Sequence, residues 1–425
     1  MTSKSLMERR EQVLGTGAKL FYQTPLELVR GEGVYLFDAA GKRYLDLYNN
    51  VPCVGHANAE VAEAMARQQA TLNVHSRYLH RGIVEFAERL TKLHAPGIES
   101  VVFSCSGTEA NEVALRMARL ATGRRGVICT NATYHGNSEA VGALSRPPQS
   151  ANSEIRAIPF PQTYRPLLPN LDEAELTDVY LYNLQTEIER LTADGTGLAG
   201  LIICSIFANE GLPDVPGRFM ERAAEMVRDA GGLVIADEVQ AGYGRTGWWW
   251  GYERAGFTPD IVVTGKPMGN GLPLAATSAS KRLVDGFRAA TNYFNTFASS
   301  PLQAAVGQAV LDVIERDGLR ENATKVGVAL KRAMVERMSR YPAIGDVRGD
   351  GLFVVVELVS DRERKTPDRD CAIDVVNRLK EKGVLTSNAG VFGNVLKLRP
   401  PLIFKEHHMS AFLAAFDETM AEIDG

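Results

Sequence analysis

The sequence predicts an α/β protein with a large domain built on a mostly parallel sheet flanked by helices, plus a smaller α+β domain. Three observations support this fold class. Helical stretches alternate with short apolar runs from about residue 57 to about residue 301, a pattern typical of right-handed βαβ crossovers. Long amphipathic helical stretches replace the alternation after about residue 302. The length of 425 residues is enough for one large domain and a smaller one.

The individual elements follow from local patterns. The pattern of residues 33–48 predicts two short antiparallel strands, at 33–38 and 41–46, around a turn at Ala40 and Gly41. Short apolar runs then predict buried strands at residues 101–103, 126–129, 201–204, 233–236 and 261–265. The later part of the chain predicts helices at 304–317 and 320–341, a strand segment at 349–358 and a closing helix at about 405–423.

These elements divide the chain into a discontinuous arrangement of two domains. We expect residues 61–301 to form the large domain. Residues 1–60 and 302–425 are expected to form the smaller domain together, because no linker or internal repeat marks a simpler division.

Composition narrows the class of function. A formal net charge of −4 gives no electrostatic reason to expect nucleic acid or an anionic membrane as a partner, so a small-molecule ligand is expected. The five cysteines are scattered without CxxC spacing, which predicts neither a disulfide framework nor a metal site and favours a reducing cytoplasm. The N-terminus is polar, and no apolar run reaches the ~18 residues of a membrane span. We therefore expect neither secretion nor membrane insertion.

Asp237 and Lys266 each follow one of the predicted apolar strands. Two parallel strands would bring the carboxylate and the amine to the same carboxyl edge of the sheet, where open α/β folds bind their ligands. A lysine there can form an imine with an aldehyde cofactor, and the aspartate can keep a basic ring nitrogen of that cofactor protonated. Aspartates and lysines also follow strands in ordinary loops. The neighbouring motifs must therefore show whether these two residues form a cofactor site.

The segment Ser106-Gly107-Thr108-Glu109 follows the strand predicted at 101–103 and begins a helix. Ser106 and Glu109 have the spacing of a capping box, which is a common structural device. A small glycine-containing turn at a helix start also exposes N–H groups that bind a phosphate. Beside an imine-forming lysine, a phosphate-bearing aldehyde explains both features.

Further polar side chains are expected at the same edge. Tyr134 and His135 follow the strand at 126–129, and the Tyr134 ring can lie flat on a pyridine ring. Gln240, three residues past Asp237, can donate to a ring hydroxyl oxygen. Each of these residues is equally compatible, on its own, with an ordinary loop.

Two residues later in the chain are candidates for anion binding. The Thr296 hydroxyl can bind a phosphate oxygen or simply cap a helix. Arg399 is followed by two prolines, which would hold its guanidinium as a fixed fork for a carboxylate. An exposed arginine is the plainer alternative.

Taken together, these motifs resemble class III (fold type I) pyridoxal-phosphate-dependent aminotransferases, and the similarity extends over nearly the whole chain. The residues that carry it are IADEVQAGYGRTG at 235–247, SGTEAN at 106–111 and TGK at 264–266. The resemblance implies a seven-stranded type of sheet and pyridoxal 5'-phosphate as the cofactor. It also implies a homodimer with shared active sites, and leaves open whether dimers pair into tetramers.

The resemblance also implies roles for single residues. Lys266 would form the Schiff base and Asp237 would meet the pyridine nitrogen. The remaining candidates would contact the phosphate from the helix start (Ser106, Gly107, Thr108), stack on or flank the ring (Tyr134, His135), bind the ring hydroxyl (Gln240), reach the phosphate of the neighbouring subunit (Thr296) and bind a substrate carboxylate (Arg399). The implied reaction moves an amino group from an amine to a keto acid, with Lys266 transferring the proton.

One departure from the family pattern bears on the substrate. Many members have Glu-Pro-Val where this chain has Cys204-Ser205-Ile206, and in those members the glutamate pairs with the carboxylate-binding arginine when the substrate lacks an α-carboxylate. Cys204 cannot form that ion pair. Arg399 would then swing away, bond elsewhere or remain a fixed clamp for one carboxylate. An ω-amine or other uncarboxylated amine as donor, with pyruvate as acceptor, fits better than 2-oxoglutarate.

A second reaction remains open within the same fold. The segment 265–271 and residues Asn49, Asn50, Gly55 and His56 resemble the branch that holds alanine–glyoxylate transaminases and phosphoethanolamine phospho-lyases. A phospho-lyase acting on a phosphorylated amino alcohol would need an additional basic pocket for the leaving phosphate. Arg77 is a candidate for that pocket, whereas Leu272 stands where many members of the branch have histidine. A non-enzymatic binding protein is disfavoured because Lys266, Asp237 and the phosphate loop are all present.

Overall fold

The computed structural model describes residues 5–145 and 153–424. Its largest sheet has seven strands in the order β4-β10-β9-β8-β7-β5-β6. The strands of this sheet are β4 (Ser100–Ser104), β5 (Gly126–Thr130), β6 (Ile155–Ile158), β7 (Leu198–Cys204), β8 (Leu233–Asp237), β9 (Ile261–Thr264) and β10 (Ala275–Ala279). Five neighbouring strands of this sheet, β9, β8, β7, β5 and β6, run parallel to one another. Strand β10 is antiparallel to both of its neighbours, β4 and β9. The prediction of a mostly parallel sheet is confirmed.

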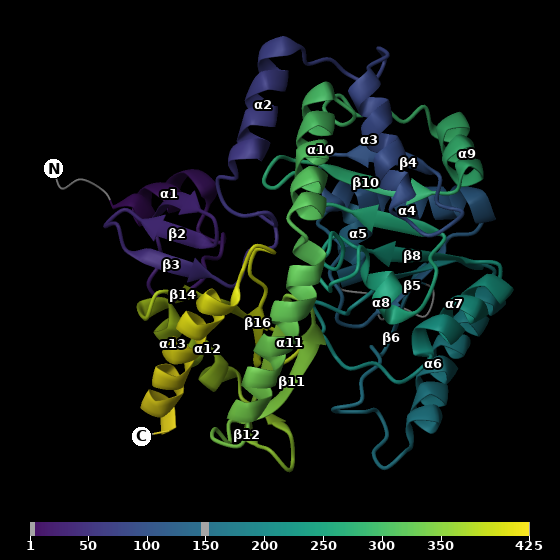
Figure 1. Ribbon diagram of the computed structural model, residues 1–425. Helices are drawn as coiled ribbons and strands as arrows, with labels where there is room; N and C mark the ends of the chain where they lie inside the picture. Colours follow the sequence, from purple (N-terminus) through teal and green to yellow (C-terminus); the bar gives the residue numbers. More distant parts are fainter. Residues whose placement is uncertain (1–4, 146–152, 425) are drawn as a thin grey trace.

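Helices cover both faces of this sheet (Figure 1). They are α3 (Arg81–Lys92), α4 (Gly107–Thr122), α5 (Glu139–Ser145), α6 (Glu173–Ala193), α7 (Phe219–Asp229), α8 (Gly251–Ala255) and α9 (Lys281–Thr291). The side chains of β7 alternate between the two layers: Leu201 and Ile203 belong to the core beneath α6 and α7, and Ile202 belongs to the core beneath α4 and α9. Burial on both faces explains why the strands read as continuous apolar runs.

The two ends of the chain form a second assembly beside the sheet, where α1, β2 and β3 lie next to α12 and α13 (Figure 1). Its N-terminal elements are α1 (Leu6–Leu14), β1 (Leu28–Glu32), β2 (Tyr35–Asp38) and β3 (Arg43–Asp46). The next helix, α2 (Ala59–Thr71), lies away from them and packs on α10 (Pro301–Arg316). The predicted antiparallel pair is confirmed as β2 and β3. The C-terminal strand β14 (Val384–Leu385) joins the same sheet by pairing in parallel with β3. The domain boundaries after residues 60 and 301 remain a prediction.

The remaining C-terminal elements are α10 (Pro301–Arg316), α11 (Leu319–Arg337), β11 (Ile344–Asp350), β12 (Phe353–Asp361), β13 (Thr366–Pro367), α12 (Arg369–Glu381), β15 (Ser387–Ala389), β16 (Val395–Leu398) and α13 (Glu406–Asp424). Helix α10 begins three residues earlier than predicted because Ser300 and Gln303 form a capping box and Pro301 occupies the first turn. The prediction of a single strand at 349–358 is wrong, because this segment contains the turn between the antiparallel strands β11 and β12. Gly349 and Gly351 adopt positive φ angles at this turn.

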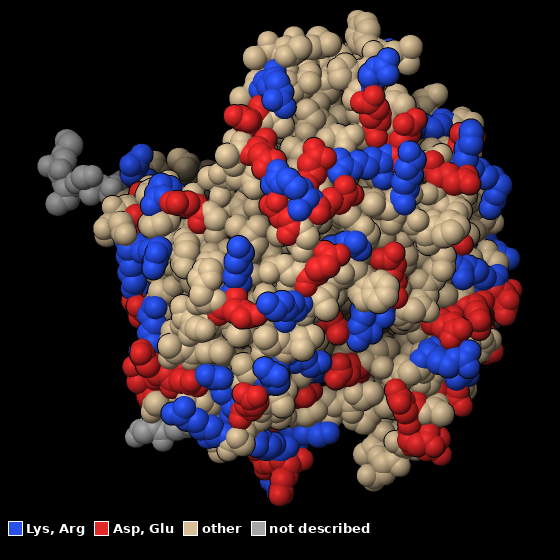
Figure 2. All heavy atoms as spheres, viewed as in Figure 1, with Lys and Arg blue, Asp and Glu red and all other residues tan. Residues whose placement is uncertain are grey.

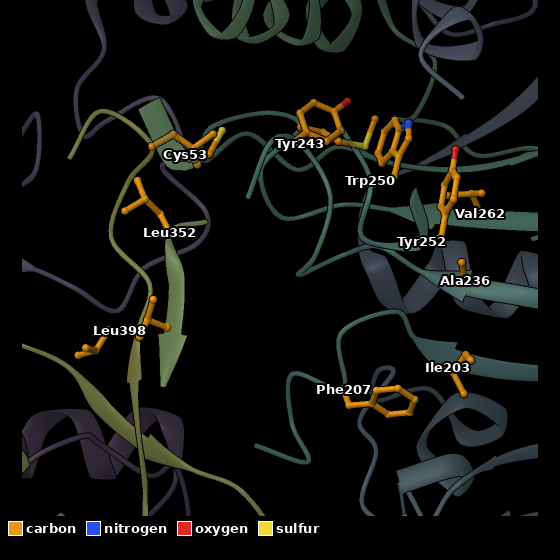
Figure 3. Packing of buried hydrophobic residues seen from close by; sticks show 14 of the residues in the cluster. Cys53, Ile203, Phe207, Ala236, Tyr243, Trp250, Tyr252, Val262, Leu352 and Leu398 are labelled. Atoms are coloured by element: carbon orange, nitrogen blue, oxygen red, sulfur yellow. The ribbon is translucent and has the colours of Figure 1, made fainter. Parts of the chain in front are cut away.

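The larger apolar core extends from the sheet face beneath α6 and α7 to the N- and C-terminal elements, and Figure 3 shows part of it with Trp250, Tyr252, Leu352 and Leu398 labelled. Trp250 is fully buried, stacks on His94 with ring centroids 4.2 Å apart and donates its indole N–H to the carbonyl of Leu93. Trp248, by contrast, is about half exposed. Of the three consecutive tryptophans, Trp250 therefore packs in the core.

The described surface carries mixed charges. On the face shown in Figure 2, lysines and arginines are interspersed with aspartates and glutamates. Every helix within residues 5–145 and 153–424 is too short or too polar to cross a membrane. The same residues contain no cluster of three metal-ligating side chains, and all five cysteines are free.

Candidate active site

The strands that carry Asp237 and Lys266 are parallel neighbours. Strand β8 pairs with β9 so that Asp237 lies opposite Val263, and Lys266 follows β9 by two residues. Both side chains line one cavity of about 100 Å³ at the carboxyl edge of the sheet. The expectation that these two residues meet at this edge is confirmed.

Asp237 is a buried carboxylate with a full set of donors. Its Oδ2 lies 2.6 Å from Nδ1 of His135 and accepts from Nδ2 of Asn111 at 3.0 Å, and its Oδ1 accepts from the Val239 backbone N–H at 3.0 Å. Burial by itself would raise the pKa of Asp237, but the hydrogen bond and charge of His135 and the other donors hold the pKa below its ordinary value. The carboxylate is therefore anionic at neutral pH and available to a cationic ring nitrogen.

Lys266 lies opposite that carboxylate with few partners of its own. Burial is the main cause that lowers the pKa of its amine, and the charge of Asp237 opposes this effect. No side-chain hydrogen bond or ion pair involves Lys266 among the described residues. A partly desolvated amine with a lowered pKa is the form of lysine that acts as a nucleophile and a base.

The start of helix α4 forms another wall of the cavity. Gly107 and Thr108 line it, whereas Ser106 is exposed and accepts from the Glu109 backbone N–H at 3.2 Å as the N-cap. The predicted capping box is only half formed, because the Glu109 carboxylate accepts from the Cys105 N–H instead of the Ser106 N–H. The free N–H groups of the first turn are thus left at the cavity wall.

The loop after β5 forms a further wall of the cavity and contacts Thr108 at the start of α4, because the Asn137 N–H donates to the Thr108 hydroxyl at 3.3 Å. Tyr134 and His135 both line it, and Tyr134 remains 42% exposed. The His135 ring is buried between Asp237 and the Thr133 hydroxyl, whose oxygen lies 2.8 Å from Nε2. His135 therefore contacts the carboxylate from behind, and Tyr134 is the residue that presents an aromatic ring to the cavity.

Gln240 and Arg399 are hydrogen bonded to each other. The Arg399 guanidinium donates through Nη1 to Oε1 of Gln240, and through Nε and Nη2 to the Tyr48 carbonyl at 3.1 and 2.9 Å. Burial lowers the pKa of Arg399 to about 10, and no carboxylate lies within ion-pair distance of it among the described residues. Of the three arrangements expected when Cys204 replaces the family glutamate, the guanidinium adopts the one in which it bonds elsewhere. Cys204 itself is buried and lines the cavity.

Three candidates are absent from the residues that line the cavity, namely Ser106, Thr296 and Arg399. The Thr296 side chain is exposed, and its neighbour Asn295 donates to the Glu109 carboxylate beside the start of α4 at 3.0 Å. Sequence reasoning also missed two polar residues. Asn111 was visible only as part of the helix motif, although its side chain binds both Asp237 and the His135 carbonyl. Lys397 lies in β16, two residues before Arg399, which follows the strand, and both cations lie near the Phe353 ring.

Comparison with known proteins identifies the family. The model of the family described as aminotransferase class-III matches residues 18–420. The chain belongs to the class-III aminotransferase family. A Drosophila melanogaster protein named alanine–glyoxylate aminotransferase 2-like is 37% identical over 100% of this chain and 88% of its own length. The chain is thus an enzyme of this family.

Two solved structures of class-III relatives are especially similar. A phospholyase from Arthrobacter in complex with phosphoethanolamine is 38% identical with a TM-score of 0.94, over 98% of this chain and 99% of that one. An omega transaminase from Pseudomonas jessenii in complex with PMP is 27% identical with a TM-score of 0.89, over 99% and 98%. The fold type I architecture is confirmed by these matches.

Class-III aminotransferases depend on pyridoxal 5'-phosphate, and the cavity residues of this chain fit that cofactor. A carboxylate, an amine and a helix start face the same space, as a ring nitrogen, an aldehyde and a phosphate require. Gly136 keeps the space near the helix start open, because a Cβ at this position would lie 2.5 Å from the Thr108 hydroxyl oxygen. Only glycine is accommodated there without displacing Thr108.

Proposed function

We propose that this enzyme is a pyridoxal 5'-phosphate-dependent transaminase that moves an amino group from an amine without an α-carboxylate to a keto acid such as pyruvate. The observation that carries the proposal is the shared cavity of the buried Asp237 carboxylate and the Lys266 amine. When bound, the cofactor supplies an aldehyde that takes up the amino group and a protonated ring that accepts the electron pair of the substrate carbon.

The remaining chemistry belongs to side chains of this chain. Asp237, held ionised by His135 and Asn111, would keep the ring nitrogen protonated. Gly107 and Thr108 would bind the phosphate, with Ser106 fixing the helix start. Nζ of Lys266 would accept the proton from the substrate carbon and return it, which its lowered pKa favours near neutral pH.

The keto acid is expected to bind at Arg399. Its guanidinium is fixed by Gln240 and by the Tyr48 carbonyl, so it presents one cationic fork at a constant position. One fork is enough for the single carboxylate of pyruvate. The Nε2 group of Gln240 would bind the ring hydroxyl oxygen in place of its present contact to Asn209, while Oε1 of Gln240 keeps its bond to Arg399.

We also propose a homodimer with shared active sites. The exposed Thr296 would serve the cofactor phosphate of the neighbouring subunit. Its surroundings support an interface, because Tyr78, Leu79 and Phe297 are 63%, 100% and 73% exposed in the single chain. The loops that carry these side chains meet where the rings of His75 and Phe294 lie 5.6 Å apart. Burying such apolar side chains against a second copy is favourable.

A second candidate function, a phospho-lyase acting on phosphoethanolamine or a similar amino alcohol, is favoured by Lys397. This lysine is only 7% exposed and lies in β16, two residues before Arg399. Both cations lie near the Phe353 ring, at 5.8 and 5.1 Å from its centroid. Two adjacent cations suit a phosphate dianion better than a single carboxylate. Arg77, the earlier candidate for this pocket, instead lies over the Phe294 ring.

The two functions share the first step and differ in the second. In both, Lys266 takes the proton of the carbon that bears the nitrogen. A transaminase returns a proton to the cofactor side, whereas a lyase lets the electron pair expel phosphate from the next carbon by breaking its C–O bond.

An assay with two products separates these functions. Holoenzyme is mixed with pyruvate and a panel of amines that includes phosphoethanolamine, and alanine and free phosphate are both quantified. We expect alanine to form without phosphate from uncarboxylated amines. Phosphate without alanine would transfer the assignment to the lyase, and neither product from any amine would contradict both.

The charge of Lys397 predicts a pH dependence. Burial lowers the pKa of this amine to about 7, so the charge is present below that pH and is lost as the pH rises above it. We expect the KM or inhibition constant of phosphoethanolamine to increase between about pH 7 and about pH 9. A Lys397→Arg variant keeps its charge and should show a smaller increase. Equal pH profiles for the two proteins would argue against a role for Lys397.

A further inference from the structure

One peptide group of the N-terminal segment, the group that joins Tyr48 to Asn49, holds the guanidinium of Arg399. The Tyr48 carbonyl of this group accepts from Nε and Nη2 of Arg399 at 3.1 and 2.9 Å. The Tyr48 ring also lies near the guanidinium, with 5.4 Å between the ring centroid and Cζ. The backbone N–H of Arg399 donates to the Leu47 carbonyl at 2.7 Å. The direction of the guanidinium therefore depends on the conformation of residues 47–49.

Asp46 fixes the other side of the same peptide group. This carboxylate is fully buried, and the proposed reaction gives it no role. Its Oδ1 accepts from the Tyr48 N–H at 2.9 Å and from the Asn49 N–H at 3.0 Å, as in an Asx turn. The Asn49 N–H and the Tyr48 carbonyl belong to one planar unit. That unit is therefore bonded to the carboxylate at one end and to the Arg399 guanidinium at the other.

The Asp46 side chain is itself held in place. Asp46 ends β3, where its N–H donates to the Val34 carbonyl at 2.9 Å and Leu385 of β14 pairs with it. Its Oδ2 accepts from Nδ2 of Asn49 at 3.0 Å and lies 2.7 Å from Nε2 of His56. Because both oxygens have two partners each, the carboxylate cannot rotate without losing several hydrogen bonds.

A second turn in the same N-terminal sheet shows what a carboxylate of purely structural function looks like. Oδ1 of Asp38 accepts from the Ala40 and Lys42 N–H groups at 3.0 and 2.9 Å, and so stabilises the turn between β2 and β3. Asp46 differs in one respect, because a peptide group that it binds also binds Arg399.

We propose that Asp46 is a positioning residue for the carboxylate site, which fixes the Tyr48–Asn49 peptide group and thereby the direction of the Arg399 guanidinium. The inference rests on the proposed binding of the keto acid at Arg399. The negative charge of Asp46 also polarises the peptide group, so that the Tyr48 carbonyl is a stronger acceptor for the guanidinium. A guanidinium that is fixed in advance loses little freedom when a carboxylate binds, and the affinity is higher for that reason.

Calorimetric titration of the holoenzyme with propionate tests this role without turnover. Propionate has the carboxylate of pyruvate but no keto group, so it binds without accepting an amino group. Asp46→Ala removes the bonds to the turn, and we expect its dissociation constant for propionate to rise by about tenfold. Asp46→Asn retains an oxygen for the two N–H groups and should stay within about threefold of the unmodified enzyme. In turnover, Asp46→Ala should raise the KM of the keto acid and leave the KM of the amine unchanged.

Asp38→Ala is the matched control, because it also removes a carboxylate from two backbone N–H groups of the same sheet. It should lower the melting temperature and leave propionate binding unchanged. An unchanged propionate affinity in Asp46→Ala would overturn the proposal, and so would an equal loss of affinity in Asp38→Ala.

A double-mutant cycle links the effect to Arg399. Arg399→Met should weaken propionate binding, and adding Asp46→Ala to that variant should cause no further loss. A further loss in this background would overturn the role of Asp46. Propionate binding that is unaffected by Arg399→Met would instead overturn the proposed keto-acid site together with this inference.

Asp46→Ser keeps the proposal testable if Asp46→Ala does not fold. Its side chain is shorter than that of asparagine and reaches the N–H groups of the turn less well, so it should bind propionate more weakly than Asp46→Asn. Equal affinities of these two variants would contradict a positioning role. Failure of the unmodified enzyme to turn over amines would contradict the proposed reaction and leave the binding results intact.

Discussion

Turnover by a Lys266→Ala variant is expected to fall by at least about 10⁴-fold, because the variant lacks both the amine that binds the aldehyde and the base that moves the proton. The amine is the one lysine side chain on the wall of the cavity. Steady-state rates with excess cofactor, together with the visible absorbance of the purified protein, measure the two losses separately. Transamination near the rate of the unmodified enzyme would refute the assignment of Lys266.

The fold should tolerate this substitution. Lys266 has no side-chain hydrogen bond within the described residues, so its removal leaves no partner unsatisfied. Since burial lowers its pKa below that of the unfolded chain, the folded protein binds this proton less tightly, and the lysine costs stability at neutral pH. The melting temperature of Lys266→Ala should equal or exceed that of the unmodified apoenzyme. A lower melting temperature would show that lost activity reflects unfolding.

Asp237→Asn is expected to lower turnover by about 10³-fold, because a neutral amide cannot stabilise the protonated ring nitrogen. The amide also disturbs the buried hydrogen bonds. Its Nδ2 must face either the donors on His135 and Asn111 or the Val239 N–H, all of which now donate to carboxylate oxygens. We therefore expect a loss of about 1–3 kcal/mol in the free energy of unfolding as well.

Glu238→Gln is the matched control for Asp237→Asn. Glu238 is the adjacent buried carboxyl group, but its oxygens accept from the Ser205 hydroxyl and from the Gly251 and Tyr252 backbone N–H groups. Burial raises the pKa of Glu238 to about 7, so an uncharged amide resembles its protonated form. Glu238→Gln should lose stability while keeping most of its turnover. Equal losses of turnover in the two variants would contradict a specific role for Asp237.

The predicted fold agreed with the structure where local pattern was sufficient. Strands β7, β8 and β9 were visible as apolar runs because they are buried on both faces. Strand β10 was missed because Ala275–Ala279 consists of small residues with no contrast to their flanks. The prediction of one strand at 349–358 overlooks the turn between β11 and β12, which the glycines at 349 and 351 mark.

The sequence by itself determined the family and the position of the reactive pair. The ends of strands are visible in the local sequence. Because parallel strands have their carboxyl ends at one edge of the sheet, two such ends predict a shared site there. Only the tertiary structure decided which buried charged side chains have polar or charged partners. Gln240 and Arg399 are 159 residues apart, yet they form a hydrogen bond, and the Tyr48 carbonyl binds Arg399 from a position 351 residues earlier in the chain. Burial and pairing of charge depend on such distant neighbours, because desolvation is a property of the folded interior and leaves no periodic pattern in the chain.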